Sequence, residues 1–212
     1  MYFDFGKLPP NECYKLFVST ITPRPIAWVV SQSGGGTLNA APFSFFNAFA
    51  ADPPVIGIGI GSHKRGRPKD TRCNIEESRQ FVVNLVSEDN AKAMNVTAID
   101  FDYGVNELDE AGLTLLPSTL IHPPRIAESP VAFECELIQS IALGEHSGLI
   151  LGRVLAMHLR DDAVIDPDHH YVDTPSLKLI GRMHGAGWYA RTSDLFKMDR
   201  IPLADWNQDR PR

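Results

Sequence analysis

Positive charge gathers in the segment VIGIGIGSHKRGRPKDTRCN, residues 55–74. Five of the chain's 20 Lys and Arg residues lie in it, with Asp70 the one acid among them: Lys64, Arg65, Arg67, Lys69 and Arg72. A helix is predicted to begin directly after this loop, and a helix N-terminus offers unpaired N–H groups and partial positive charge to an anion. The lysines and the hydroxyl of Thr71 could therefore bind a phosphate. A solvated charged loop explains the cluster equally well.

Ile and Gly alternate in the strand that precedes this loop. Ile56, Ile58 and Ile60 are predicted to point to one face, which leaves only glycine on the other. Glycine weakens a strand, so a row of it indicates that something approaches the backbone closely. Two explanations are open: a neighbouring strand or large side chain packs there, or a flat ligand lies against the strand.

Polar residues interrupt the aromatic stretch NAAPFSFFNAFAADPP, residues 39–54. A hydrophobic barrel strand explains the Phe residues. It explains less well the presence of Asn39, Ser44 and Asn47, because buried polar groups need hydrogen-bond partners. A heterocycle rich in amide and carbonyl groups would supply such partners.

Two further segments carry residues that could serve a site. His146 lies at the tip of a predicted hairpin in LGEHSGLILGRV (143–154), as an exposed turn residue or as a group that binds phosphate or orients a substrate. Arg182 and His184 lie near Trp188 and Tyr189, in a glycine-rich segment that could close over a site.

These residues need strands to position them. β-branched and aromatic runs bounded by Gly and Pro predict strands at 25–31, 37–46, 55–60, 81–86, 131–143 and 148–159. The glycines at 34–36 suit the turn of the first hairpin. Helices are predicted at 70–79, with Asp70 or Thr71 as N-cap, at 87–99, and briefly near 107–111. This pattern predicts a mainly β fold, a Greek-key β-barrel with short flanking helices.

Composition narrows the class of protein. A net charge of −6 argues against a general nucleic-acid binder. No apolar run reaches the roughly 20 residues of a membrane helix, and the N-terminus does not resemble a secretory signal. Three cysteines without C-x-x-C spacing indicate reduced thiols in a cytoplasmic protein, and no His pair has the spacing of a helical metal site. At 212 residues the chain is most simply one domain, here 1–205, followed by a flexible tail at 206–212.

The motifs occur in an order that resembles the flavin reductase-like family with the FMN-binding split barrel. They are PRPIAWVVS (23–31), LNAAPFSFFN (38–47), DPP (52–54), KDTRCNI (69–75), FVVNLV (81–86) and GEHSGLILGRV (144–154). The resemblance spans roughly residues 20 to 190. It implies a six-stranded Greek-key split barrel that binds FMN as a homodimer.

The resemblance also implies site residues. Ala41, Pro42, Ser44 and Phe46 would line the isoalloxazine ring and ribityl chain, and Arg24 and Asn39 would join them as cofactor-binding residues. Ser62, Lys64, Lys69 and Thr71 would hold the phosphate. His146 would lie on the nicotinamide or substrate side as the catalytic residue, although Glu145 replaces the family's usual Asp. Trp28 could lie over the flavin, but core packing is favoured.

The function implied is an NAD(P)H-dependent oxidoreductase, in which hydride passes from NADH or NADPH to flavin N5 and electrons leave to an acceptor. A monooxygenase or another electron-accepting protein is the expected partner. Two alternatives stay open: a flavoredoxin-like electron carrier reduced by a partner protein, and a non-catalytic protein that binds flavin or another ligand.

Overall fold

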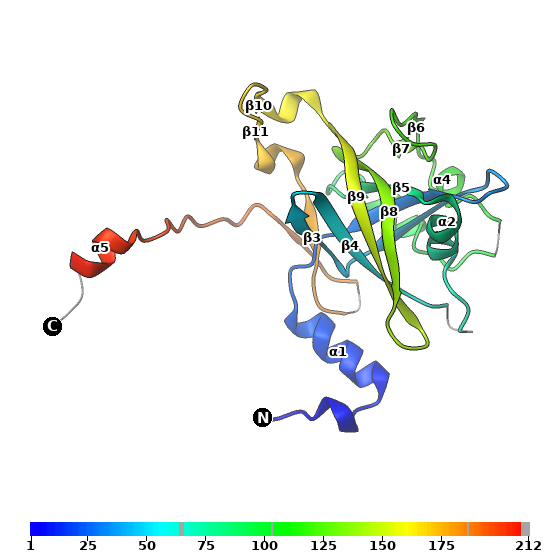
Figure 1. The fold of residues 1–212 in the computed structure, drawn as a ribbon, viewed down its shortest axis with the longest axis horizontal. Helices are drawn as coiled ribbons and strands as arrows, with labels where there is room; N and C mark the ends of the chain where they lie inside the picture. Colours follow the sequence, from blue (N-terminus) through cyan, green and yellow to red (C-terminus); the bar gives the residue numbers. More distant parts are fainter. Residues whose placement is uncertain (64–65, 103, 186, 209–212) are drawn as a thin grey trace.

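A single curved sheet dominates the computed structural model, which describes residues 1–63, 66–102, 104–185 and 187–208. Its strands run antiparallel in the order β2-β1-β5-β8-β9-β4-β3 (Figure 1). They are β1 (Ala27–Gln32), β2 (Leu38–Phe43), β3 (Phe46–Ala51), β4 (Pro54–Gly61), β5 (Gln80–Leu85), β8 (Val131–Ala142) and β9 (Ser147–Leu159).

The two edge strands, β2 and β3, are consecutive in the chain, and only Ser44 and Phe45 separate them. The sheet therefore curls until its edges approach each other at this corner, and the β3–β4 ladder extends into the corner, where Gly59 N donates to Phe45 O at 2.6 Å. The mainly β, Greek-key split barrel is confirmed. The prediction of one strand over 37–46 was wrong, because the chain turns a corner at Ser44, and the main sheet has seven strands where six were expected.

Apolar side chains pack on both faces of the sheet. Ile56, Ile58 and Ile60 point into one cluster together with Phe81 and Ile150, which confirms the predicted face of β4. Trp28 lies fully buried in the cluster on the other face, where its Nε1 donates to Thr97 Oγ1 at 2.9 Å. Core packing of Trp28 is thus confirmed.

Five α-helices are described: α1 (Pro10–Thr20), α2 (Asp70–Ser78), α3 (Ala91–Val96), α4 (Glu107–Glu110) and α5 (Leu203–Gln208). Of these, α2, α3 and α4 flank the sheet. Short 3-10 helices lie at Phe5–Lys7, Asp161–Ala163 and Thr174–Leu177. Two boundaries differ from the prediction. Helix α3 is shorter than 87–99, because Asn90 Oδ1 accepts from Ser87 N and holds the preceding residues in a turn. The N-cap of α2 is Lys69 and makes no side-chain cap, so neither Asp70 nor Thr71 caps the helix.

The remaining elements are small antiparallel pairs and the two ends of the chain. The pairs are β6 (Leu115–Leu116) with β7 (Arg125–Ile126), β10 (Val164–Asp166) with β11 (Tyr171–Val172), and β12 (Ile180–Arg182) with β13 (Tyr189–Arg191). Helix α1, which was not predicted, and the extended segment ending in α5 both project from the barrel (Figure 1). Helix α5 extends through Gln208, into the part expected to be an unstructured tail. None of the described helices has the length and apolarity to cross a membrane.

Candidate functional site

A cavity of about 80 Å³ lies where α2 begins, between strand β2 and the segment 97–101. Residues 39–42 of β2 and residues 69–71 at the start of α2, about thirty positions apart in the sequence, meet there. Five of the predicted cofactor-binding residues line it: Asn39, Ala41, Pro42, Lys69 and Thr71. The curl of the barrel therefore brings the aromatic stretch and the loop before α2 to one place, as the resemblance implied.

A chain of hydrogen bonds fixes the floor of this cavity. Thr71 Oγ1 donates to Asn39 Oδ1 at 2.6 Å, and Asn39 Nδ2 donates to Glu107 Oε1 at 2.7 Å. The other oxygen of Glu107 accepts from Ala40 N at 3.0 Å. Burial raises the pKa of Glu107 above its ordinary value. The polar residue that interrupts the aromatic stretch at position 39 is thus satisfied within the protein, without the heterocycle that the sequence suggested.

Positive charge at the cavity comes from Lys69 and the start of α2. Lys69 Nζ lies 5.7 Å from the centre of the Phe43 ring, in a cation–π contact that holds the ammonium group near β2. The N–H groups of Asp70 and Thr71 occupy the first turn of a nine-residue helix, where no intrahelical acceptor exists. The predicted ligand Lys64 and the unassigned Arg65 lie outside the described residues.

The other cations of the loop have protein partners. Arg67 lies 3.7 Å from Asp70. Arg72 pairs with Glu76 at 2.8 Å, and its guanidinium covers the place where a Cβ on Gly148 would stand. Arg72 is therefore a packing residue between α2 and β9.

Side chains explain the glycine row of β4. A Cβ on Gly57 would lie 2.5 Å from Phe49 Cε2, and one on Gly59 would lie 3.0 Å from Phe45 Cβ. A Cβ on Gly61 would meet no described atom within 4 Å. Close packing of large side chains, the first of the two explanations, accounts for the first two glycines, and only Gly61 leaves open space.

Arg24 and Ser44 take part in one hydrogen-bond cluster that links separate segments of the chain. The buried guanidinium of Arg24 donates from Nη1 to Val18 O and Ile21 O at 2.9 Å each, from Nη2 to Met183 O at 2.8 Å, and from Nε to Ser44 Oγ at 3.2 Å. These four hydrogen bonds use nearly all of the N–H donors of the guanidinium group within the protein. Phe46, also assigned to the ring, is half-buried against the barrel core. These contacts favour structural roles for all three residues.

The hairpin tip reaches the loop before α2, but not the cavity. The ring of His146 lies 3.7 Å from the place where a Cβ on Gly66 would stand, and 63% of its side chain is exposed. Ser62 pairs with Pro68 in an isolated bridge and does not line the cavity. Arg182 stacks over Tyr189, with 4.6 Å from Cζ to the ring centre, and its buried Nη1 has no partner among the described residues.

Two of the cavity residues that were not predicted as site residues carry side chains of chemical interest, Glu107 and His63. The sequence placed Glu107 only in a short helix near 107–111 and gave it no role in a site. His63 lines the cavity, and its Nε2 is buried without a hydrogen-bond partner in the described chain. The only signal for His63 was its place between two predicted phosphate ligands, Ser62 and Lys64.

The chain belongs to the family described as Flavin reductase like domain, whose model matches residues 19–175. This agrees with the split-barrel fold.

Particular relatives agree with this assignment. An uncharacterized protein of Deinococcus radiodurans is 41% identical over 98% of this chain and 92% of its own length. The structure of 2-nitrobenzoate 2-nitroreductase NbaA from Pseudomonas fluorescens is 35% identical, with a TM-score of 0.86 over 96% of this chain and 97% of that one. Nitrilotriacetate monooxygenase component B from Bacillus cereus is 32% identical, with a TM-score of 0.87 over 93% and 98%.

Proposed function

We propose that this protein is an FMN-dependent NAD(P)H oxidoreductase of the flavin reductase type. The observation that carries the proposal is the cavity at the start of α2, where Lys69 and free helix N–H groups meet Ala41 and Pro42 of β2. Bound FMN would supply the redox chemistry, taking hydride from NADH or NADPH at N5 and passing electrons to an acceptor. The names of the two similar structures, a nitroreductase and a monooxygenase component, support this class of reaction.

The cavity fits one end of such a cofactor. An engineered cavity of about 150 Å³ binds benzene, so one of about 80 Å³ suits a phosphate better than a flavin ring. Lys69 and the first turn of α2 would hold the phosphate. Asn39 and Thr71 would shape the floor through their mutual hydrogen bond. Ala41 and Pro42, which carry no polar side-chain atoms, would border the ring beyond the mouth. His146, exposed on the neighbouring hairpin, would act on the nicotinamide side.

An anaerobic titration tests this function. The protein would be reconstituted with FMN and titrated with NADH and then NADPH while the flavin absorption band is followed. We expect bleaching by at least one nucleotide and recovery of the band with a nitroaromatic compound, free flavin or a partner monooxygenase as acceptor. Bleaching by neither nucleotide, but by a reduced partner protein, would favour the electron carrier. A colourless protein that cannot be reconstituted would contradict both.

We also propose that the protein works as a homodimer in the cytoplasm, where its three free cysteines would stay reduced. Strand β3 forms one edge of the sheet, and its residues 47–51, Asn-Ala-Phe-Ala-Ala, are all exposed and uncharged. Natural proteins protect such an edge with charge, proline or a covering element. Tyr14 of the projecting helix α1 lies 6.2 Å from Phe45 beside this strand, ring centre to ring centre. A second copy would cover this surface.

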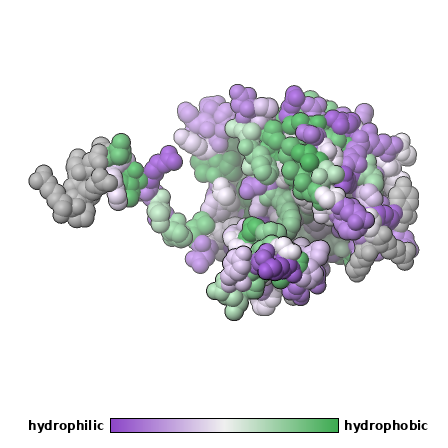
Figure 2. Space-filling view, turned by 60° about the horizontal axis from the view of Figure 1, so that its bottom comes forward, coloured by the Kyte–Doolittle hydropathy of each residue, from purple (hydrophilic) through white to green (hydrophobic). Residues whose placement is uncertain are grey.

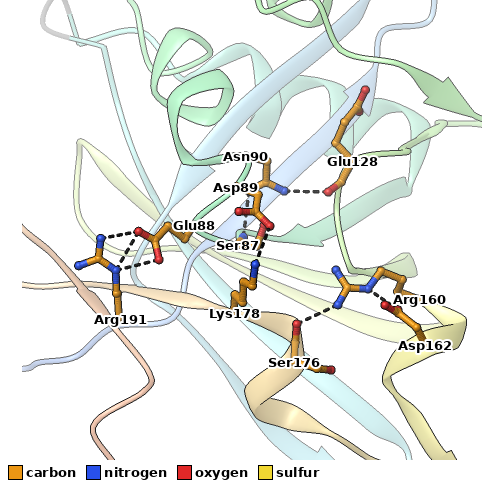
Figure 3. A network of polar contacts seen from close by, with 10 residues as sticks. All are labelled: Ser87, Glu88, Asp89, Asn90, Glu128, Arg160, Asp162, Ser176, Lys178 and Arg191. Atoms are coloured by element: carbon orange, nitrogen blue, oxygen red, sulfur yellow. Dashed lines mark hydrogen bonds and ion pairs between the residues drawn. The ribbon is translucent and has the colours of Figure 1, made fainter.

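The C-terminal arm, residues 193–208, supports the same arrangement. Arg191 binds both carboxylate oxygens of Glu88 and anchors the root of the arm to the barrel (Figure 3). Beyond this anchor the arm leaves the body and carries hydrophobic side chains in the open, as the green atoms at the left of Figure 2 show. They include Leu195, Phe196, Met198, Ile201 and Leu203, of which Phe196 and Met198 are more than 80% exposed.

Light scattering after size exclusion tests the dimer. We expect a mass of about twice 23.5 kDa for the natural chain. A double change, Phe196→Glu with Met198→Glu, should shift the protein towards the monomer, whereas Asp194→Lys, which changes charge on the same arm, should not. A natural chain that elutes as a monomer at all concentrations would contradict the proposal.

A further inference from the structure

A second cavity, of about 540 Å³, lies at the end of the β8–β9 hairpin that is farthest from its turn (Figure 1). Residues from 125 to 132, between β7 and the start of β8, form one wall, and residues 157–161, at the end of β9, form the other. Small-molecule sites typically have volumes of about 300–1,000 Å³, so this cavity has the size of a ligand site. Among the described residues, none lines both this cavity and the candidate cavity at the start of α2.

The two cavities are far apart on the sheet. Strand pairing connects Met157 of β9 across β8, β5 and β1 to Ala41 of β2, which makes four strand spacings. At about 4.8 Å each, these spacings give a path of about 19 Å along the sheet. His146, in the hairpin turn, precedes His158 by twelve positions, which is about 40 Å of extended strand. The second cavity is therefore a separate site and not an extension of the one proposed for flavin.

Arg125 brings a positive charge to this cavity that has no partner in the described chain. Its Nε is buried and unpaired, and its guanidinium takes part in no hydrogen bond or ion pair with another described residue. The backbone of Arg125 is fixed by pairing with Leu116 in the β6–β7 ladder. A guanidinium stays charged and carries five N–H donors, and leaving a partly buried charge without an acceptor is unfavourable. An anion in the cavity would supply the missing acceptor.

A buried carboxylate fixes another polar group in the wall, the imidazole of His158. Glu134 is fully buried, and its Oε1 lies 2.6 Å from His158 Nε2. The same carboxylate accepts from Thr119 N at 2.6 Å and from Leu120 N at 2.7 Å. An ionised carboxylate only accepts hydrogen bonds, so Nε2 is the donor of the pair. Nδ1 has no partner among the residues that the structure describes, so a ligand can use it as a donor when the ring is protonated.

Arg160 adds a second guanidinium, which is held in place from both sides. Its Nε donates to Asp162 Oδ1 at 2.5 Å, and its Nη2 donates to Ser176 O at 2.8 Å (Figure 3). These contacts leave Nη1 without an acceptor in the described part of the chain. The orientation of this donor is therefore set before any ligand binds, which lowers the cost of ordering it.

The rest of the lining is partly apolar and partly acidic. The apolar residues are Pro130, Ala132, Met157 and Leu159, and Met157 is 54% exposed. Both carboxylate oxygens of Glu128 accept from Thr114 N, at 3.0 and 3.2 Å, which commits that group to the backbone. Asp161 also lines the cavity. Because an acid lies among the cations, repulsion disfavours a dianion such as phosphate more than a singly charged ligand.

We propose that this cavity binds a small monocarboxylate with an apolar body. The guanidinium of Arg125 holds the carboxylate, since its planar fork matches the two oxygens with parallel hydrogen bonds. His158 and Arg160 supply further donors, and the body of the ligand lies against Met157 and Leu159. The site needs no flavin, so this inference stands or fails separately from the proposed function.

The test compares 4-fluorobenzoate with 4-fluorobenzamide, which has the same shape and no charge. Dissociation constants would be measured by ¹⁹F NMR titration, with and without saturating FMN, for the natural chain, Arg125→Met and Arg125→Lys. Met keeps much of the apolar stem of Arg, and Lys keeps the charge without the fork. The control is Arg153→Met, which removes a guanidinium that pairs with Glu136 on the same hairpin and does not line the cavity. Thermal unfolding of each variant shows whether it is folded.

We expect the natural chain to bind the benzoate at least about tenfold more tightly than the benzamide, with or without FMN. Arg125→Met should weaken benzoate about 10- to 100-fold, the range for losing a hydrogen bond to a charged group. Arg125→Lys should lose less, and Arg153→Met should stay within about twofold of the natural value.

Four outcomes would overturn the proposal. The first is benzoate affinity in folded Arg125→Met and Arg125→Lys within about twofold of the natural value. The second is equal affinity for benzoate and benzamide, which would remove recognition of charge. The third is displacement of benzoate by FMN, which would place the ligand in the candidate cavity at the start of α2. The fourth is a natural chain that shows no saturable binding of benzoate, or that releases it to inorganic phosphate as readily as to unlabelled benzoate.

Discussion

Replacing Glu107 by Ala should destabilise the protein through the floor of the candidate cavity at the start of α2. Glu107 is the one side chain that accepts from both Asn39 Nδ2 and the amide of Ala40. Ala40 is fully buried and Asn39 is 9% exposed, so neither donor is open to bulk water while the carboxylate is in place. The change therefore removes one group and leaves two donors unpaired.

The magnitude follows from those two donors. An unsatisfied buried donor costs about 1–3 kcal/mol. The lower end applies because Glu107 itself is only half-buried and water can enter the space it leaves. Burial of the Glu107 carboxylate is itself unfavourable, as its raised pKa indicates. Removing the carboxylate relieves this unfavourable burial and offsets part of the cost. The two donors together cost about 2 kcal/mol before this offset, so a net loss of about 1–2 kcal/mol is expected, which lowers Tm by about 2–8 °C in a chain of this size.

Urea and thermal unfolding measure this loss against a matched control. Glu110→Ala removes an exposed carboxylate from the same helix, α4, and should change stability by less than about 0.5 kcal/mol. The double change Glu107→Ala with Asn39→Ala should cost less than the sum of its parts, because the two residues share one hydrogen bond. Equal stability of Glu107→Ala and Glu110→Ala, or strict additivity in the double variant, would refute the reasoning.

Three further outcomes follow from the same contacts. Gly152→Ala places a Cβ 2.5 Å from Cζ of the buried Phe81 and should cost about 1–3 kcal/mol in urea unfolding, whereas Gly61→Ala meets no described atom within 4 Å and should be neutral. Arg24→Ala removes the donors to the last carbonyls of α1, so limited proteolysis should cut residues 10–21 earlier than in the natural chain. Burial raises the folded pKa of Glu107 above its ordinary value of 4.5. The stability that the protonated carboxyl contributes is therefore present below pH 4.5 and is lost as the pH rises through the folded pKa. The difference in unfolding free energy between the natural chain and Glu107→Gln should change over that pH window and not above it.

Most of the fold could be predicted from the sequence, because each strand is specified by a pattern of adjacent residues. Alternating Ile and Gly in β4, and the long runs of β8 and β9, specify buried faces without reference to distant residues. The corner at Ser44 could not be predicted in this way. It depends on the sheet curling until β2 and β3 meet, and the Phe residues on both sides of Ser44 are equally typical of one continuous strand.

Helix α1 and the C-terminal arm show a different limit. Both carry exposed aromatic or aliphatic side chains, and the contacts that would bury them do not lie within the described chain. Hydrophobic residues without helical or strand periodicity, as in residues 193–202, indicate no element of their own. Their structure would be decided by a second copy, which one sequence does not describe.

For the candidate site, too, features that depend on residues adjacent in sequence could be predicted, whereas features that depend on distant residues could not. The loop before α2 could be predicted to bind an anion because charge and a helix start are adjacent in sequence. The acceptor to which each side-chain donor gives its hydrogen could not be predicted from the sequence. Thr71 carries a hydroxyl suited to phosphate, yet its hydrogen goes to Asn39, 32 positions earlier, because Glu107 orients that amide from a third segment. The environment of His63 could not be predicted for the same reason: whether its Nε2 finds a hydrogen-bond partner depends on the packed chain, and in the described residues it has none. A residue type thus indicates what a side chain can donate, whereas only the packed structure shows which donors are still free for a ligand.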